Sequence, residues 1–303
     1  MRSSEEILNL ILRIAETDYN TRAVLLNGSR ANPNARTDKY QDFDIVYIVS
    51  HIESFLYDHS WIDIFGERII LQMPDEMTIG VKDEKSVVGV FTDHNQPKVG
   101  VFTDHNRCFH YLMLFKDKIR IDLTLFPVEK LRTFKKSSLT ILLLDKDNLF
   151  KNLTPPSDED YLIQPPSEKE FNDCCNEFWW VSTYVAKGIA RNETIYALEM
   201  LEIHVRPMFL KIIEWYIGIE KSFSVSFGMY GKFMKDHIST ELYEKILSTY
   251  PGGNAENIWN CLFLMTKLFS ELADKISTSL ELSYNIVEEL NVIEYLKDVH
   301  EQM

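Results

Sequence analysis

Cysteine is scarce in this sequence, and its four copies are not spaced as a zinc site requires. Two of them, Cys174 and Cys175, are adjacent on a predicted helix, where we expect them to be small buried apolar side chains. The eight histidines form no zinc-binding pattern either. A zinc-dependent structure or activity is therefore not expected.

Long apolar runs are also missing. No run reaches the roughly 20 residues that a transmembrane helix needs, and the N-terminus lacks the pattern of a secretory signal peptide. We therefore expect a cytoplasmic protein with reduced thiols and no membrane partner.

Basic residues are outnumbered by acidic ones. The 32 Lys and Arg residues against 46 Asp and Glu residues give a net charge of -14 and a pI of about 5.1. Such a surface disfavours non-specific binding to nucleic acid, so we expect no nucleic-acid partner. It would attract a polycationic substrate, although acidity that keeps a cytosolic protein soluble is the simpler explanation.

The hydrophobic pattern divides the chain in two. Its 303 residues suffice for two domains, and a hydrophobic content of 45% is that of a globular protein. Strands and helices are mixed before a turn-rich stretch that contains prolines, and helical spacing dominates after it. We predict an α+β fold, with a mixed-sheet domain at residues 1–153, a linker at 154–167 and an all-helical bundle domain at 168–303.

Individual elements follow from periodicity. Ser3 and Glu6 form a capping-box pattern, which predicts a helix to about Thr17. A short helix is expected near Ile52. Apolar runs and alternation predict strands near residues 22–27, 43–49, 68–73, 109–115 and 119–126. Apolar residues at three- and four-residue spacing predict helices at 168–190, 193–217 and 254–276.

Two motifs on neighbouring predicted strands point to chemistry. Gly28-Ser29 follows the first strand, and Asp42-Phe43-Asp44 enters the second. Side chains i and i+2 of a strand share a face, so Asp42 and Asp44 project together and favour a cation between them. Mg²⁺ binds one or two carboxylates plus substrate phosphates, so the motifs predict a site for a nucleoside triphosphate carried on metal ions. Each motif alone is common in ordinary turns and strands.

A third carboxylate lies on another predicted strand. Asp122 shares a face with Arg120 and Thr124 in a stretch that alternates polar and apolar residues. An ordinary exposed strand residue is the alternative interpretation. Together with the two motifs, Asp122 strengthens the prediction of a metal-dependent site.

Seven stretches carry a further signal: Gly28–Arg30, Gln41–Ile45, Trp61–Arg68, Ile121–Leu125, Leu143–Asp147, Asp173–Trp179 and Tyr184–Glu193. They resemble the aminoglycoside 6-adenylyltransferases, the streptomycin-modifying branch of the nucleotidyltransferase superfamily. The combination of Gly-Ser with Asp-x-Asp marks the superfamily, whereas the Cys-Cys-Asn-Glu-Phe-Trp stretch is specific to the narrower family. The resemblance runs from the first helix to about residue 275.

The resemblance implies a nucleotidyltransferase-type sheet domain and an enzyme that transfers AMP from ATP to an aminoglycoside hydroxyl, with the 6-hydroxyl of streptomycin as first candidate. Such an enzyme gives antibiotic resistance. Mg²⁺ would be held by Asp42 and Asp44, with Asp122 as third ligand or as general base. These three carboxylates are the candidate catalytic residues and metal ligands.

Two segments are candidates for binding the nucleotide. Gly28, Ser29 and Arg30 form the turn expected beside the phosphates. The resemblance adds Lys187, since related nucleotidyltransferases hold the triphosphate with a Lys from the first helix of the helical domain. We assign Tyr184, one turn earlier on the same face, to the nucleotide site with Lys187.

One face of the predicted helix 168–190 mixes charged and aromatic residues: Asp173, Glu177, Trp180, Tyr184, Lys187 and Arg191. We expect this face to pack across a cleft from the catalytic domain, and a solvated face with local ion pairs is the alternative. Glu177 on this face and Glu76 in the sheet domain are candidate ligands for the guanidinium or ammonium groups of the drug.

A segment of the sheet domain is present twice. Residues 88–95 recur as residues 99–106 with eight identical positions, which indicates a tandem duplication. The family usually has a shorter connection here. We expect a hairpin or a disordered loop.

Two alternatives to aminoglycoside modification remain open. The chain could transfer a nucleotide to another small-molecule or protein hydroxyl, or it could be a non-catalytic nucleotide-binding protein of the same fold. The intact carboxylates argue against the second alternative. The sequence also leaves open whether the protein is a monomer or a homodimer.

Overall fold

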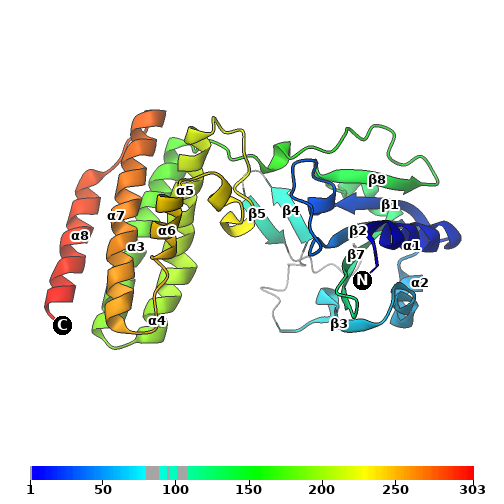
Figure 1. Cartoon of the computed structure of the whole chain (residues 1–303), viewed down its shortest axis with the longest axis horizontal. Coiled ribbons are helices and arrows are strands. Elements are labelled where there is room, and N and C mark those ends of the chain that lie inside the picture. The colour runs from blue at the N-terminus through cyan, green and yellow to red at the C-terminus, as the bar shows by residue number, and fades with distance from the viewer. Residues whose placement is uncertain (1, 80–88, 94–95, 101–107) are drawn as a thin grey trace. The chain divides into compact units, whose positions relative to one another are not determined.

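A computed structural model of the chain describes residues 2–79, 89–93, 96–100 and 108–303 (Figure 1). It forms two compact units, Met1–Asp160 and Tyr161–Met303. The first contains a mixed sheet and the second is helical, which confirms the predicted α+β class. The boundary falls inside the predicted linker 154–167, and the assignment of catalytic and helical domains to these units stays a prediction.

Six strands of the first unit form one sheet in the order β3-β6-β7-β2-β1-β8. Their bounds are β1 Thr21–Asn27, β2 Phe43–Val49, β3 Arg68–Gln72, β6 Phe109–Phe115, β7 Arg120–Pro127 and β8 Thr140–Asp145. β2 and β7 run parallel, and the other neighbouring pairs of this sheet are antiparallel. The five predicted strands are confirmed. β8 is not among them, although its apolar run Ile141–Leu144 is of the same kind as the runs that predict β1 and β2.

Helix α1, Ser4–Thr17, covers one face of this sheet. It begins with the predicted capping box, in which the Ser3 hydroxyl accepts a hydrogen bond from the Glu6 amide at 3.1 Å. Its apolar stripe packs on the sheet, where the Tyr47 hydroxyl donates to the Ile11 carbonyl at 2.7 Å. The short helix expected near residue 52 is α2, Glu53–Leu56.

The opposite face of the sheet is apolar in its middle and polar at one end. Ala23, Leu25, Val46 and Ile48 are buried on this face under the segments that follow β7 and β8. Because side chains alternate along a strand, Asp44 lies on the same face as Val46 and Ile48. The Asp-x-Asp motif is therefore carried on the face away from α1.

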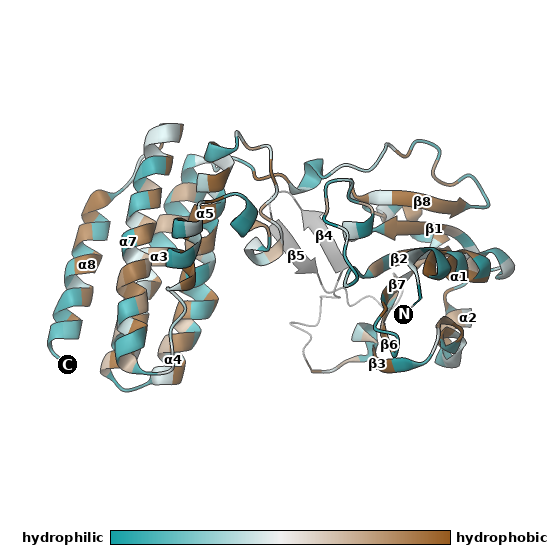
Figure 2. Ribbon diagram, viewed as in Figure 1, coloured by the Kyte–Doolittle hydropathy of each residue, from teal (hydrophilic) through white to brown (hydrophobic). Residues whose placement is uncertain are grey.

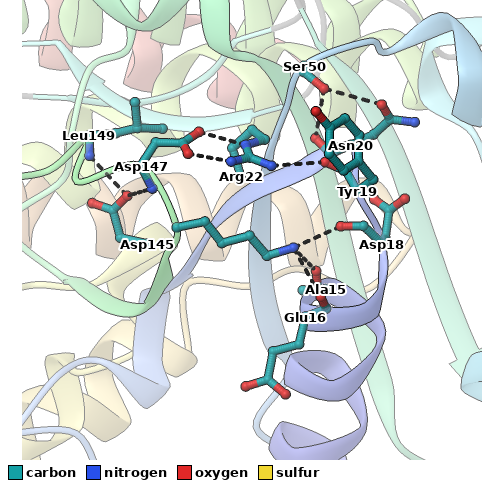
Figure 3. A network of polar contacts seen from close by, with 11 residues as sticks. Ala15, Glu16, Asp18, Tyr19, Asn20, Arg22, Ser50, Asp145, Asp147 and Leu149 are labelled. Atoms are coloured by element: carbon teal, nitrogen blue, oxygen red, sulfur yellow. Dashed lines mark hydrogen bonds and ion pairs between the residues drawn. The ribbon is translucent and has the colours of Figure 1, made fainter.

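Lys146, directly after β8, is hydrogen-bonded to the end of α1, where Figure 3 labels Ala15, Glu16 and Asp18. The Nζ of Lys146 donates to the carbonyls of Ala15 at 2.7 Å, Asp18 at 2.8 Å and Glu16 at 3.2 Å. The last carbonyls of a helix lack intrahelical partners, and the helix dipole favours a cation there. Burial lowers the pKa of Lys146, and the neighbouring Arg22 acts in the same direction.

Further polar contacts surround this lysine (Figure 3). Arg22 donates from Nε to the Asp147 carboxylate at 2.6 Å, and the Asp145 carboxylate accepts the Leu149 amide at 2.9 Å. The stretch Leu143–Asp147 carries part of the family resemblance. Its polar residues make contacts that hold the sheet domain together, which gives them a structural role.

The second unit is a bundle of amphipathic helices, whose long members carry both apolar and polar residues (Figure 2). They are α3 Glu168–Ala190, α4 Thr194–Glu199, α5 Arg206–Glu220, α6 Thr240–Leu247, α7 Ala255–Leu280 and α8 Ile286–Glu301. In the core, Phe178 of α3 stacks on Phe269 of α7 with 3.7 Å between ring centroids. Cys174 and Cys175 are buried as predicted, and burial raises the pKa of the Cys175 thiol to about 12.

The predicted helix 168–190 is confirmed, and the predicted helix 254–276 corresponds to α7. The predicted helix 193–217 is divided by a π-helical segment, Met200–Val205. Pro207 follows it, and a proline ring collides with the carbonyl four residues earlier, so the wider turn avoids this clash. Among the helices of the described residues, none is long and apolar enough to span a membrane.

Part of the duplicated segment forms a separate antiparallel pair. β4, Gly89–Asp93, pairs with β5, Gln96–Gly100, so that Gly89 lies opposite Gly100. The beginning of the first copy thus pairs with the beginning of the second. A hairpin is one of the two forms expected, and the rest of the duplication at 88–106 lies outside the described residues.

The contacts of Lys146 predict a measurable effect on stability. Lys146→Met should lower the free energy of unfolding by about 1–3 kcal/mol, because three carbonyls lose a charged donor. Urea denaturation followed by circular dichroism would measure the change. Lys151→Met removes an exposed lysine and is the matched control. Equal stability of the two variants would show that Lys146 does not stabilise α1.

Candidate functional site

Polar residues lie side by side across four strands at one end of the sheet. Asp44 of β2 pairs with Asp122 of β7 on one side and with Asn27 of β1 on the other. Asn27 in turn pairs with Thr140 of β8, whose hydroxyl donates to the Asn27 side chain at 2.9 Å. Neighbouring strands are about 4.8 Å apart. Asp44 and Asp122 are therefore adjacent on one face.

Gly28 makes room for one of these carboxylates. It directly follows β1, with a φ of +71°. A Cβ atom added there would lie 2.1 Å from Oδ2 of Asp44. The left-handed backbone and the close approach each require glycine. The Gly28-Ser29 turn therefore lies directly against the Asp-x-Asp motif.

Arg30, predicted to bind phosphate, holds the loop that enters β2. Its Nε donates to the Asp42 carbonyl at 2.9 Å, Nη2 to the Gln41 carbonyl at 2.8 Å and Nη1 to the Ser4 hydroxyl at 3.0 Å. Its guanidinium also lies 3.7 Å from the centroid of the Phe43 ring. Burial lowers the pKa of Arg30, against the effect of nearby carboxylates. These contacts orient the Asp-x-Asp motif, and a direct phosphate contact by the remaining N–H groups stays a prediction.

Arg120 is the site residue that the sequence analysis did not assign. It donates to both oxygens of Asp122, from Nε and from Nη2, each at 2.7 Å. The same Nε lies 3.7 Å from Oδ2 of Asp42. The signal was present in the sequence, since residues i and i+2 of a strand share a face. What the sequence could not give is the proximity of β7 to Asp42.

The charge balance at this end of the sheet suits a divalent cation. Burial raises the pKa of Asp42, and Asp122 adds to this, while Arg120 and Arg30 offset only part of it. Within the described ranges, no three His, Cys, Asp or Glu side chains are grouped as a metal site. Asp42 and Asp44 offer the carboxylates that Mg²⁺ takes together with substrate phosphates, so the residues fit this ion, and the assignment of Asp42, Asp44 and Asp122 as its ligands stays a prediction.

Glu76, a candidate for drug binding, lies in the turn Pro74–Glu76 after β3, where its carboxylate is 3.2 Å from Nε2 of His59. The neighbouring Asp75 accepts the His110 amide at 2.7 Å and lies 3.0 Å from the Nδ1 of that ring. Burial lowers the pKa of His110, but the hydrogen bonds of its ring with Asp75 and Cys108 outweigh this effect and raise the pKa to about 9. This buried ion pair fixes the turn that carries Glu76.

The face of α3 that includes Glu177 is exposed at Glu177 and Trp180 and half-buried at Tyr184 and Lys187 within the second unit. Trp180 is 58% exposed, and its Nε1 donates to the Tyr184 hydroxyl at 2.9 Å. The Nζ of Lys187 lies 5.3 Å from the centroid of the Tyr184 ring. Glu177 is exposed one turn before Trp180. These residues share a face as predicted, and their contact with nucleotide or drug stays a prediction.

The structure thus brings Gly28, Ser29, Asp42, Asp44 and Asp122 together in the first unit. It places Glu76 in a separate turn of that unit. Tyr184, Lys187 and Glu177 belong to the second unit.

Because Gly28 contacts Asp44, one added methyl group at this position is predicted to reduce both stability and metal binding. Gly28→Ala should displace the Asp44 carboxylate and strain the backbone, at a cost on the order of 1–3 kcal/mol in stability. Mn²⁺ binding, followed by the paramagnetic resonance of the free ion, should weaken by about 10-fold or more. Gly253→Ala is the control, because no atom lies within 4 Å of its added Cβ. Unchanged Mn²⁺ binding in a folded Gly28→Ala protein would contradict the proposed position of the cation.

Comparison with known proteins identifies the family of the chain. A family model for streptomycin adenylyltransferases matches residues 1–96 and 93–299. The two segments overlap within the 88–106 duplication, as expected when one stretch of the family is present twice. The match covers nearly the whole chain.

Individual relatives are similar over the same length. An aminoglycoside 6-adenylyltransferase of Campylobacter jejuni is 39% identical over 290 residues, which cover 95% of this chain and 93% of that protein. One of Bacillus subtilis (strain 168) is 36% identical over 286 residues, covering 94% and 93%. A crystal structure of an aminoglycoside 6-adenyltransferase from Bacillus subtilis matches 99% of both chains at 33% identity, with a TM-score of 0.46. The family model and the identity to the two sequence relatives show that the chain belongs to the streptomycin adenylyltransferase family.

Proposed function

We propose that this chain transfers AMP from ATP to a hydroxyl of an aminoglycoside, with the 6-hydroxyl of streptomycin as acceptor, and so gives resistance to the drug. The observation that carries this proposal is the close contact of Gly28 with Asp44 beside Asp122. It occurs in a chain that matches its family over nearly its whole length. The names of the relatives support the aminoglycoside and the 6-position.

In this proposal the chain positions the reactants and balances their charge. Mg²⁺ bound by Asp42 and Asp44 would neutralise charge on the triphosphate and on the departing pyrophosphate. Arg30 keeps the Asp-x-Asp motif in place through the carbonyls of the preceding loop. The acceptor hydroxyl attacks the α-phosphorus, and its proton passes to a carboxylate, for which Asp122 is the candidate.

The other candidate residues are proposed to bind the phosphates of ATP or the cationic groups of the drug. Ser29 follows Gly28 directly and is proposed to contact the phosphates with the remaining N–H groups of Arg30. Lys187, with Tyr184 beside it, is proposed to bind the β- and γ-phosphates. Glu177 and Glu76 are proposed to bind the cationic groups of the drug.

An acceptor panel tests the reaction. The purified protein, incubated with α-labelled ATP and Mg²⁺, should label streptomycin and leave other aminoglycosides, other small-molecule hydroxyls and protein hydroxyls largely unlabelled. Labelling of a different acceptor class would replace the proposed substrate. Nucleotide binding without labelling of any acceptor would favour a non-catalytic protein.

Asp44→Asn tests the metal chemistry within the same assay. The variant should fold but transfer AMP roughly 100-fold more slowly or worse, because a neutral amide is a poor ligand for a cation that contributes several kcal/mol. Asp298→Asn changes an exposed carboxylate of α8 and is the control. Near-normal turnover of folded Asp44→Asn would refute the Asp-x-Asp assignment.

Two variants of α3 test whether its exposed face meets both substrates. Lys187→Ala should raise the KM for ATP roughly 10- to 150-fold, because a charge-assisted phosphate contact contributes about 1.5–3 kcal/mol. Glu177→Gln should instead raise the KM for streptomycin and leave the ATP dependence alone. Lys297→Ala, an exposed lysine of α8, is the control. If neither variant changes either parameter, this face is an ordinary solvated surface.

A further inference from the structure

Arg120 engages Asp122 more completely than it engages the other two carboxylates. Both oxygens of Asp122 accept a hydrogen bond of 2.7 Å from the same guanidinium. This two-point geometry is available to arginine and not to lysine. Asp42, in contrast, is 3.7 Å from the nearest nitrogen of Arg120. The guanidinium therefore orients Asp122 and reaches Asp42 through its charge.

The contacts divide the three carboxylates into two groups. Asp44 lies against Gly28 and belongs, with Asp42, to the loop and strand that Arg30 holds. Asp122 is 19% exposed, and a cation approaching its remaining lone pairs would stand close to the guanidinium of Arg120. A divalent cation is therefore favoured at Asp42 and Asp44 and disfavoured at Asp122.

The same arginine also offsets the repulsion within the cluster. Asp44 and Asp122 are paired on parallel neighbouring strands, where like charges disfavour each other. Arg120 interacts electrostatically with all three carboxylates. It can therefore hold Asp122 in place whether or not a metal ion has bound nearby.

We propose that Arg120 is a positioning residue that withholds Asp122 from the divalent cation and keeps it for the acceptor hydroxyl. The inference rests on the proposed function. In the transfer step the acceptor oxygen bonds to the α-phosphorus, and pyrophosphate leaves with the electron pair of the broken bond. The hydroxyl proton passes to the Asp122 carboxylate, whose orientation Arg120 fixes.

Measurements of metal binding test, without relying on turnover, whether Asp42 and Asp44 bind the cation and Asp122 does not. Mn²⁺ binding to the protein with a non-hydrolysable ATP analogue is measured by the paramagnetic resonance of the free ion. Asp42→Asn should weaken binding about 10-fold or more, whereas Asp122→Asn should change it less than about 3-fold. Equal weakening by both variants would show that Asp122 is a metal ligand and would overturn the inference.

Removal of the arginine gives the opposite change. Arg120→Met should tighten Mn²⁺ binding by about 10-fold, because Asp122 becomes free to join the metal site. This gain should disappear in the double variant Arg120→Met with Asp122→Asn. A gain that persists in the double variant would mean that Arg120 acts through its charge alone, which would overturn the inference.

Arg120→Lys distinguishes the effect of the charge from the effect of the two-point geometry. It also replaces Arg120→Met in the test if the melting temperature shows that Arg120→Met does not fold. Lysine keeps the charge but cannot bind both Asp122 oxygens in parallel. We expect tighter Mn²⁺ binding than in the unchanged protein, together with a lower kcat and a KM for ATP within about 2-fold. Mn²⁺ binding and kcat equal to those of the unchanged protein would contradict a positioning role.

The two proposals fail in different ways. If the unchanged protein does not adenylylate streptomycin but the Mn²⁺ results are as expected, the proposed acceptor is wrong and the division of the carboxylates stands. If streptomycin is adenylylated but Asp122→Asn weakens Mn²⁺ binding as much as Asp42→Asn, the role of Arg120 is wrong and the proposed function stands.

Discussion

The parallel pairing of β2 with β7 is the constraint on which the site depends. It places Asp44 and Asp122 at the same level of one face, although 78 residues of sequence separate them. A shift of β7 by one residue relative to β2 would turn the Asp122 side chain towards α1. It would place an apolar neighbour of Asp122 beside Asp44 at the polar end of the sheet. The shift is prevented because Phe43, Ile121 and the alternate residues after them fill the core beneath α1. The apolar core therefore determines which charges meet.

Much of the fold follows from local patterns in the sequence. The capping box at Ser3, the apolar runs and alternation of five strands and the periodicity of α3 each identify an element without its partners. β8, α6 and α8 were not predicted, and two of these elements depend on their surroundings. β8 is a short apolar run that becomes a strand by pairing with β1. α8 buries the carboxylate of Glu289, which accepts a hydrogen bond from Ser270 at 2.6 Å, so its apolar stripe is interrupted in sequence.

The site was partly predictable for the same reason. Residues two apart on a strand must share a face, so Asp42 and Asp44 could be grouped from the sequence, and the motif also indicated Gly28. The role of Arg30 could not be foreseen, because it holds the loop before β2 through two backbone carbonyls, which any sequence offers. The link between Arg120 and Asp42 needed the sheet order, which local periodicity does not contain. The types and spacing of the charged residues thus indicated the chemistry of the site. The order of the strands in the sheet determines which of these residues contact one another.

The position of β8 has a consequence for biosynthesis. β1 and β8 are neighbours in the sheet, yet Asn27 and Thr140, which pair across them, are 113 residues apart in the chain. While the chain is being made, β1 is an edge strand with one row of unpaired backbone groups until β8 leaves the ribosome. Such long-range pairing slows folding. The incomplete sheet is therefore a stage at which this protein is exposed to aggregation, and the hydrogen bonds of Lys146 to the end of α1 form only once β8 has emerged.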